Sequence, residues 1–317
     1  MIGFAYRFHE GAAQSCSIDE ALDRVCDFVW VHLDSNTAEA QHWLSNKAGL
    51  PDYIVEPLTA TETRPRCDAM ADGAFLNLRG RSSEVMSMSD LLASVRIWAT
   101  AGRVISVTRK PMIAMPQVIA AMEAGDLRDP GDLIAEFAIA ITAELDPEVA
   151  ELGDALDDCE TEIDADKIFE LRREVTKVRA TSIGYRRFLA PQRGAIEKLA
   201  ALPVPWLRDD DRMHLNAAAD RAARMAEELE SIRERSALMH EALTDLRAEQ
   251  IDQRALVISV VAMIFLPLTF LTGLLGMNVA GIPYAHAPWA FDGVVLGCVV
   301  IAIAITGFFI RRHWFPD

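Results

Sequence analysis

The hydrophobic residues of this chain are concentrated towards its C-terminal end. No charged residue occurs between Ala255 and Phe291, and the first 21 residues of that stretch are almost wholly apolar. At about 1.5 Å per residue, a helix of that length extends about 30 Å, enough to cross the hydrocarbon core of a bilayer. A second charge-free run follows from Gly293 to Ile310, after a loop that contains glycine and proline. The pattern predicts transmembrane helices at 255–277 and 291–311, joined by a loop at 278–290.

Positive charges flank this predicted hairpin on one side. Arg247 and Arg254 precede the first span, Arg311 and Arg312 follow the second, and the loop contains no Lys or Arg. The positive-inside rule therefore places both ends, including a tail at 312–317, in the cytoplasm and the loop in the periplasm. The N-terminus lacks the basic and apolar segments of a secretory signal. We expect a multi-pass protein of a bacterial inner membrane.

The N-terminal part mixes strand and helix patterns. Residues 27–34, 74–80 and 102–110 are rich in β-branched and aromatic side chains and predict strands. Segments between them, such as 37–50, have helical spacing of apolar residues. Together these patterns predict a cytoplasmic α/β domain at 1–145.

Long charged helices follow, and we assign 146–254 to a helical stalk. The stretch from Asp209 to Leu266 contains neither glycine nor proline, so we expect one helix from Asp211 to Leu275 that includes the first span. Its apolar positions recur at steps of three and four, a heptad seam that predicts packing against other helices. The seam comprises Leu215, Ala218, Ala222, Met225, Leu229, Ile232, Ser236, Met239, Leu243 and Leu246.

Charge narrows the classes of partner. The chain has 31 Lys and Arg against 47 Asp and Glu, a formal net charge of −16. The charges from Ala255 onward cancel, so the acidic excess lies in the first 254 residues. A nucleic-acid-binding protein needs a basic surface, and none is indicated, so we expect no nucleic-acid partner.

Motifs for single-chain catalysis are missing from the sequence. There is no HExxH, no clustered Cys and His spacing, no P-loop and no Gly-rich dinucleotide motif. We therefore expect neither an enzyme nor a resident cofactor. The acid-rich stretch 144–166, which includes Cys159, has two readings: a regulatory site for divalent cations, or a solvated helix surface.

Two spans cannot enclose an aqueous path, so transport requires an oligomer with one helix per subunit around an axis. Such a helix needs a stripe of small or polar residues, and steps of three and four from Asp252 give one. Polar side chains on this stripe offer oxygen atoms, and an apolar one can gate by dewetting. The alternative is that small residues only allow close helix packing. The candidate pore-lining residues are Asp252, Ala255, Ser259, Ala262, Leu266, Thr269 and Gly273.

The same stripe extends backwards to three carboxylates, Glu234, Glu241 and Asp245. In a ring of subunits they form a negative funnel that raises the local cation concentration. The alternative is a solvated face of a charged helix. Anion transport does not fit this pattern.

The segment from Ile264 to Asn278, IFLPLTFLTGLLGMN, resembles the first transmembrane helix of the CorA family of divalent-cation transporters, which ends in Gly-Met-Asn. The layout of the whole chain is similar to that family as well. The resemblance implies a funnel-shaped homopentamer in the lipid bilayer with one central pore. It also implies an outer selectivity site at Gly276, Met277 and Asn278, where a hydrated divalent cation binds. Thr269 then forms a second polar ring and Leu266 a hydrophobic ring.

The loop after this motif, Val279 to Pro283, contains no acidic residue. It resembles the zinc-transporter branch of the family, the ZntB-like proteins, which implies Zn²⁺ as the transported cation and uptake coupled to protons, with efflux as another proposed direction. A channel for Mg²⁺, Co²⁺ or Ni²⁺ of the CorA type is the alternative. A membrane-anchored metal sensor or scaffold is an alternative of another class.

Overall fold

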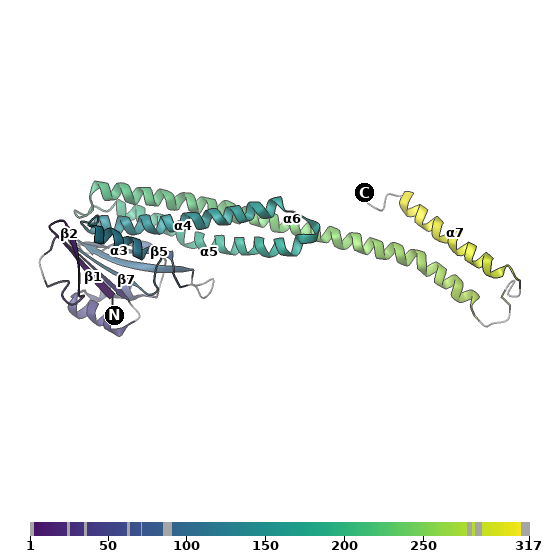
Figure 1. Cartoon of the computed structure of the whole chain (residues 1–317), viewed down its shortest axis with the longest axis horizontal. Helices are drawn as coiled ribbons and strands as arrows, with labels where there is room; N and C mark the ends of the chain where they lie inside the picture. The colour runs from purple at the N-terminus through teal and green to yellow at the C-terminus, as the bar shows by residue number, and fades with distance from the viewer. Residues whose placement is uncertain are drawn as a thin grey trace. The chain divides into compact units, whose positions relative to one another are not determined.

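The computed structural model describes residues 3–23, 26–34, 37–61, 64–70, 72–84, 91–277, 281–282 and 287–311. The chain divides into two compact units (Figure 1). The first comprises residues 1–163 and 169–240, and the second comprises 164–168 and 241–317. Each unit is described by itself.

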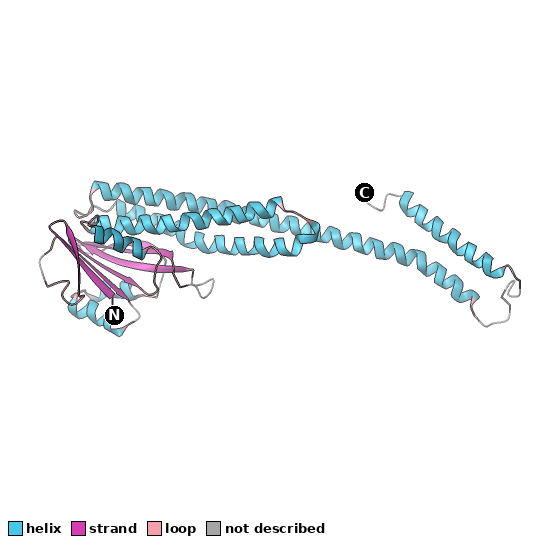
Figure 2. Cartoon of the chain, viewed as in Figure 1, coloured by secondary structure: helices cyan, strands magenta, loops and turns pink. Residues whose placement is uncertain are grey.

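The first unit is built on a seven-stranded sheet with the order β2-β1-β3-β7-β6-β5-β4 (Figure 2). Neighbouring strands are antiparallel except β3 and β7, which are parallel. The strands are β1 (Gly3–His9), β2 (Ala12–Cys16), β3 (Phe28–Asp34), β4 (Arg66–Met70), β5 (Gly73–Arg81), β6 (Leu92–Thr100) and β7 (Arg103–Thr108).

Helices cover both faces of this sheet. On one face, Trp43, Leu44 and Leu58 pack with side chains of β3 and β7. On the other face, Val118 and Phe137 belong to a larger core around Trp30, Leu76 and Ile97. The first face is covered by α1 (Ala38–His42), the π-helical turn Trp43–Lys47 and α2 (Asp52–Thr59), and the second by α3 (Met115–Ala124) and α4 (Pro130–Thr161).

Three of the strands, β3, β5 and β7, lie where the sequence predicts them, and the helical pattern at 37–50 corresponds to α1 and the turn after it. Four strands do not stand out in the sequence. In β6 the reason is Arg96, which is 1% exposed and interrupts an otherwise apolar strand with a buried charge.

The remaining helices are α5 (Ile168–Ala200), α6 (Asp209–Leu275) and α7 (Ala290–Arg311). The α4 helix continues through Pro147, so the change of sequence pattern at residue 146 falls inside a helix. The α6 helix is continuous over 67 residues: it begins in the stretch 209–266, which lacks glycine and proline, and continues through Pro267 and Gly273. A short 3₁₀ turn at Ala165–Lys167 separates α4 from α5.

The heptad seam of α6 is buried as far as Leu243, and Leu246 is half-buried, which confirms the packing role of the seam in the first unit. Leu215 and Leu229 are fully buried in the core that also holds Leu145 of α4 and Leu189 of α5. The buried seam residues of this unit are Leu215, Ala218, Ala222, Met225, Leu229, Ile232, Ser236 and Met239.

Ion pairs occupy part of the acid-rich stretch of α4. Arg235 of α6 pairs with Asp157, and with Glu160 at 2.7 Å. The Cys159 thiol is buried, and burial raises its pKa. A protonated, buried thiol beside carboxylates that already have a cationic partner favours the reading of this stretch as an ordinary helix surface.

Candidate functional site

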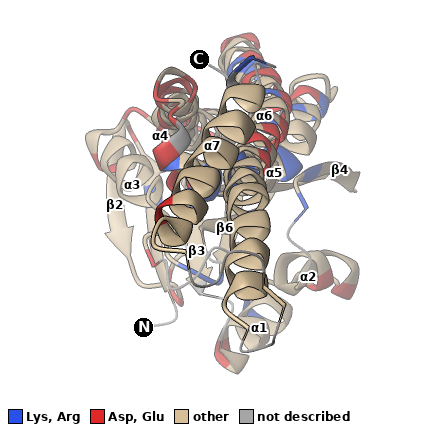
Figure 3. Ribbon diagram, turned by 90° about the vertical axis from the view of Figure 1, so that its right-hand side faces the viewer, with Lys and Arg blue, Asp and Glu red and all other residues tan. Residues whose placement is uncertain are grey.

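Among the described residues, two helices are long and apolar enough to cross a membrane, the C-terminal part of α6 and α7. Very little of their apolar stretches is buried within the chain, and Figure 3 shows α7 almost without charged residues. Side chains such as Phe265, Phe270 and Ile303 are between 61% and 70% exposed. So much exposed apolar surface requires a lipid or protein environment, as the sequence predicts for two spans.

The predicted pore-lining stripe lies on an exposed face of α6. All of its residues from Asp252 to Gly273 are exposed, and Leu266 is 75% exposed. A different row along the same segment is half-buried or buried: Leu256, Val260, Ile264, Leu268, Leu271 and Leu275. At about 100° per residue, the two rows lie about 180° apart around the helix. The stripe is thus turned away from the row that the chain itself shields.

Hydroxyl groups on this helix bond to its own backbone. The Ser259 hydroxyl donates to the Ala255 carbonyl oxygen at 2.8 Å. Thr272, which lies off the stripe, donates to the Leu268 carbonyl oxygen at 2.9 Å. In each case the hydrogen is used within the helix, which leaves the lone pairs of the oxygen facing outward.

Carboxylates gather next to the stripe at the end that precedes the span. A surface hollow of about 440 Å³ is lined by Asp245, Glu249 and Asp252, together with Ala248, Gln253 and Leu256. Glu249 was not among the residues expected from the sequence. It stands four residues after Asp245 and three before Asp252, a spacing that shares one helix face and therefore a usable signal.

The other two predicted funnel carboxylates are also exposed. Glu241 is exposed in the second unit. Glu234 belongs to the first unit, its side chain is 66% exposed, and one of its oxygens is 3.9 Å from Arg233. Both side chains face solvent, as either a cation funnel or a solvated helix face requires.

The Gly-Met-Asn motif begins where α6 ends. The Gly276 N–H donates to the Thr272 carbonyl oxygen at 2.9 Å, and Met277 is 47% exposed. Asn278, the main polar ligand expected from the resemblance, lies outside the described residues. The role of this motif as a selectivity site therefore stays a prediction.

One further group of carboxylates lies close together among the described residues. Asp129, Asp132 and Asp211 each place a ligand atom within 4.8 Å of the others. Asp129 accepts hydrogen bonds from the Gly131 and Asp132 N–H groups at the start of α4, and Arg208 pairs with it at 3.0 Å. Burial raises the pKa of Asp211 to about 6, helped by the neighbouring carboxylates. This group joins the N-terminal ends of α4 and α6, where helix dipoles favour negative charge.

The fold and the exposed polar stripe define a class of membrane protein: an N-terminal α/β unit, long helices, and two C-terminal spans of which the first can line a path. A family model described as "CorA-like Mg2+ transporter protein" matches residues 26–312. The chain belongs to the CorA family of divalent-cation transporters. Its relatives are transporters and not enzymes, and it is an inner-membrane protein whose N-terminal soluble part lies in the cytoplasm.

Individual relatives are similar to this protein in sequence or structure over most of the chain. The zinc transport protein ZntB of Pectobacterium atrosepticum is 30% identical over 286 residues, 90% of this chain and 87% of the relative. The divalent cation transporter CmaX of Pseudomonas aeruginosa is 34% identical over 281 residues, 88% and 84% of the two chains. The structure of full-length CmaX matches with a TM-score of 0.79 at 30% identity, over 99% of this chain and 98% of that one. The complete CorA magnesium transporter of Methanocaldococcus jannaschii shares the fold, with a TM-score of 0.80 at 19% identity over 99% of both chains.

Proposed function

We propose that five copies of this chain form a transporter for Zn²⁺, with one α6 helix from each copy around a central path. The observation that carries this proposal is the exposed stripe of α6, which lies about 180° from the row shielded within the chain. A single chain cannot enclose a path, and among the exposed positions of this helix the stripe is the row of small and polar residues that suits an axis. The polar and small residues on it, among them Ser259 and Thr269, then face the cation.

Charge supports a cation as the cargo. The hollow beside the stripe is lined by three carboxylates, Asp245, Glu249 and Asp252. Five copies would place fifteen carboxylates around the cytoplasmic mouth, which raises the local concentration of cations and excludes anions. The oxygen of Ser259 accepts hydrogen bonds and suits a cation that keeps its water shell.

Zinc is proposed as the cargo on two grounds. Relatives named zinc transport protein ZntB match over about nine-tenths of this chain. The sequence after Gly276 also lacks acidic residues until Asp292, as in the zinc branch that it resembles. The relative named divalent cation transporter CmaX matches as well, so transport of Mg²⁺ or Co²⁺ is the competing assignment.

Flux into proteoliposomes tests the proposal. The full chain is reconstituted, and uptake of Zn²⁺, Mg²⁺, Co²⁺ and Ni²⁺ is measured with and without a pH gradient. Asn278→Ala and Thr269→Val remove polar groups expected to face the ion, and Thr272→Val is the matched control, since its hydroxyl lies off the stripe and bonds to the backbone.

The expected result is Zn²⁺ flux that both test variants reduce at least tenfold and the control leaves within twofold. No flux of any divalent cation would reject transport and favour a sensor or scaffold. Flux of Mg²⁺ with Zn²⁺ excluded would reverse the choice of cargo. Equal rates of Zn²⁺ uptake with and without a pH gradient would reject the hypothesis that uptake is coupled to protons.

A further inference from the structure

A cavity in the first unit lies at the carboxyl ends of the two parallel strands. The chain leaves β3 towards α1 and α2 on one face of the sheet, and leaves β7 towards α3 on the other face. Because neighbouring parallel strands send their connections to opposite faces, a crevice forms between them at that edge. In open α/β sheets such a switch point is the preferred place for a ligand.

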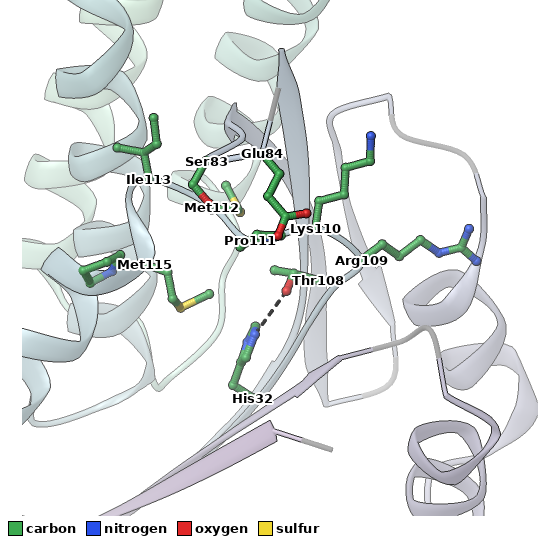
Figure 4. A pocket seen from close by; sticks show the side chains of 11 residues that line it. His32, Ser83, Glu84, Thr108, Arg109, Lys110, Pro111, Met112, Ile113 and Met115 are labelled. Atoms are coloured by element: carbon green, nitrogen blue, oxygen red, sulfur yellow. Dashed lines mark hydrogen bonds between the residues drawn. The ribbon is translucent and has the colours of Figure 1, made fainter. Parts of the chain in front are cut away.

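The cavity at this crevice has a volume of about 720 Å³, in the range of pockets for small organic ligands. His32 comes from β3, Thr108 ends β7, and Met115 begins α3. Figure 4 shows His32 and Thr108 facing each other, with the other lining side chains around them. The lining is completed by Ser83, Glu84, Arg109, Lys110, Pro111, Met112, Ile113 and Pro116.

A buried chain of hydrogen bonds leads to this cavity. Trp30 Nε1 donates to Ser106 Oγ at 2.8 Å, Ser106 Oγ lies 2.8 Å from His32 Nδ1, and His32 Nε2 lies 3.2 Å from Thr108 Oγ1. Trp30 and Ser106 are fully buried, and His32 and Thr108 are 7% and 6% exposed. The His32 imidazole is neutral near pH 7, because burial lowers its pKa to about 4.

The direction of these bonds follows from the donors available. If Ser106 donates to His32 Nδ1, then Nε2 carries the ring hydrogen and donates to Thr108. The opposite tautomer leaves the hydroxyl hydrogen of the fully buried Ser106 without an acceptor among the described contacts, which is costly. The first arrangement instead leaves the Thr108 hydroxyl hydrogen to be donated at the cavity wall.

Further donors and an apolar wall complete the cavity. Lys110 supplies a cation, and Ser83 supplies a second hydroxyl. Arg109 adds positive charge, although its Nη2 donates to the Thr59 carbonyl oxygen at 2.7 Å, and Glu84 is the one carboxylate among the described lining residues. The described lining residues, Lys110, Arg109 and Glu84, therefore carry a net charge of +1. The remaining lining residues form an apolar wall and are Pro111, Met112, Ile113, Met115 and Pro116.

We propose that this cavity binds a small organic phosphate of nucleotide size. Its phosphate oxygens accept hydrogen bonds from Thr108, Ser83 and Lys110, and its apolar or aromatic body lies on the methionine and proline wall. A phosphate suits the site because several oxygens can accept from several donors at once. The site lies within the cytoplasmic unit and uses none of the residues of the cation path.

Binding to the purified full chain in detergent tests this proposal without any transport step. AMP, ADP and inorganic phosphate are titrated by isothermal calorimetry in metal-free buffer. Thr108→Val and Lys110→Met are the test variants, and Lys110 is half-buried at the rim, so its replacement leaves the core intact. Lys47→Met is the matched control, since this exposed lysine pairs with Asp19 away from the cavity.

The expected result is saturable binding of AMP or ADP, at least tenfold tighter than inorganic phosphate, which each test variant weakens about tenfold and the control leaves unchanged. No saturable binding of either nucleotide would overturn the proposal, as would binding that both test variants leave unchanged. Equal affinity for inorganic phosphate would overturn the part assigned to the apolar wall. Failure here leaves the assignment of the cation path unaffected.

Discussion

Glu144 is a carboxyl group held between α4 and the sheet. Its Oε1 accepts the backbone N–H of Arg81 at 2.5 Å, while its Oε2 is buried without a hydrogen-bond partner in the described structure. Burial raises the pKa of Glu144 from 4.5 to about 7, although the Arg81 N–H and charge act in the opposite direction. The folded protein therefore holds a proton on this group more tightly than the unfolded chain does.

Because the folded and unfolded states bind the Glu144 proton with different affinity, the free energy of unfolding depends on pH. Because the native state binds more protons, the contribution of Glu144 to the free energy of unfolding is fully present below pH 4.5 and is lost as pH rises through about 7. At about 1.4 kcal/mol per pKa unit the loss is about 3 kcal/mol, and partial solvent exposure reduces it to about 2 kcal/mol. Glu144→Gln replaces the group with a neutral one of the same shape and removes this dependence.

We expect the variant and the native chain to have similar stability at pH 5, and the variant to be more stable by about 2 kcal/mol at pH 8. For a unit of this size that corresponds to a melting temperature about 4–8 °C higher. The assay is thermal unfolding of the full chain in detergent, followed by tryptophan fluorescence between pH 5 and pH 8. Glu151→Gln, which changes an exposed carboxylate of the same helix, is the control. If the melting temperatures of the native chain and of Glu144→Gln changed in parallel between pH 5 and pH 8, the reasoning would be refuted.

Two more predictions concern packing and gating. Gly131→Ala places a Cβ 2.1 Å from Asp211 Oδ2, so this buried carboxyl group must leave its position, and we expect a loss of about 1–3 kcal/mol in unfolding free energy. Gly184→Ala meets nothing within 4 Å and should instead stabilise by about 0.5–1 kcal/mol, measured in the same thermal assay. Leu266→Ser should raise the ion leak across planar bilayers, because it removes an apolar ring from the proposed path, whereas Leu274→Ser, off the stripe, should not. An unchanged leak in Leu266→Ser would place the gate elsewhere.

The long helix and its faces were predictable because their pattern is local. The absence of glycine and proline from residues 209–266 predicts a continuous helix there, and the spacing of Leu215, Leu229 and similar residues identifies its buried side. The same spacing of three and four residues places Leu266 on a different face of α6, where its side chain is exposed. Helix patterns repeat every few residues, so a short stretch of sequence contains the information.

The sheet and its cavity were less predictable because they depend on distant residues. Arg96 is fully buried within β6, and its surroundings come from other strands. The bond from Trp30 to Ser106 and the bond between His32 and Thr108 each join residues that are 76 positions apart in the sequence. No local pattern signals such pairs, since they arise only when β3 and β7 align.

In the proposed path, the backbone bond of the Ser259 hydroxyl would favour one kind of hydrated ion over another. Its hydrogen is fixed to the Ala255 carbonyl oxygen, so towards the proposed path the side chain offers only lone pairs. Each water around a cation keeps both hydrogens to donate to such an oxygen, whereas each water around an anion points one hydrogen at the ion and its outward oxygen finds no donor there. Ion sign would thus be sensed through the orientation of water molecules, at a point on the helix that carries no charge of its own.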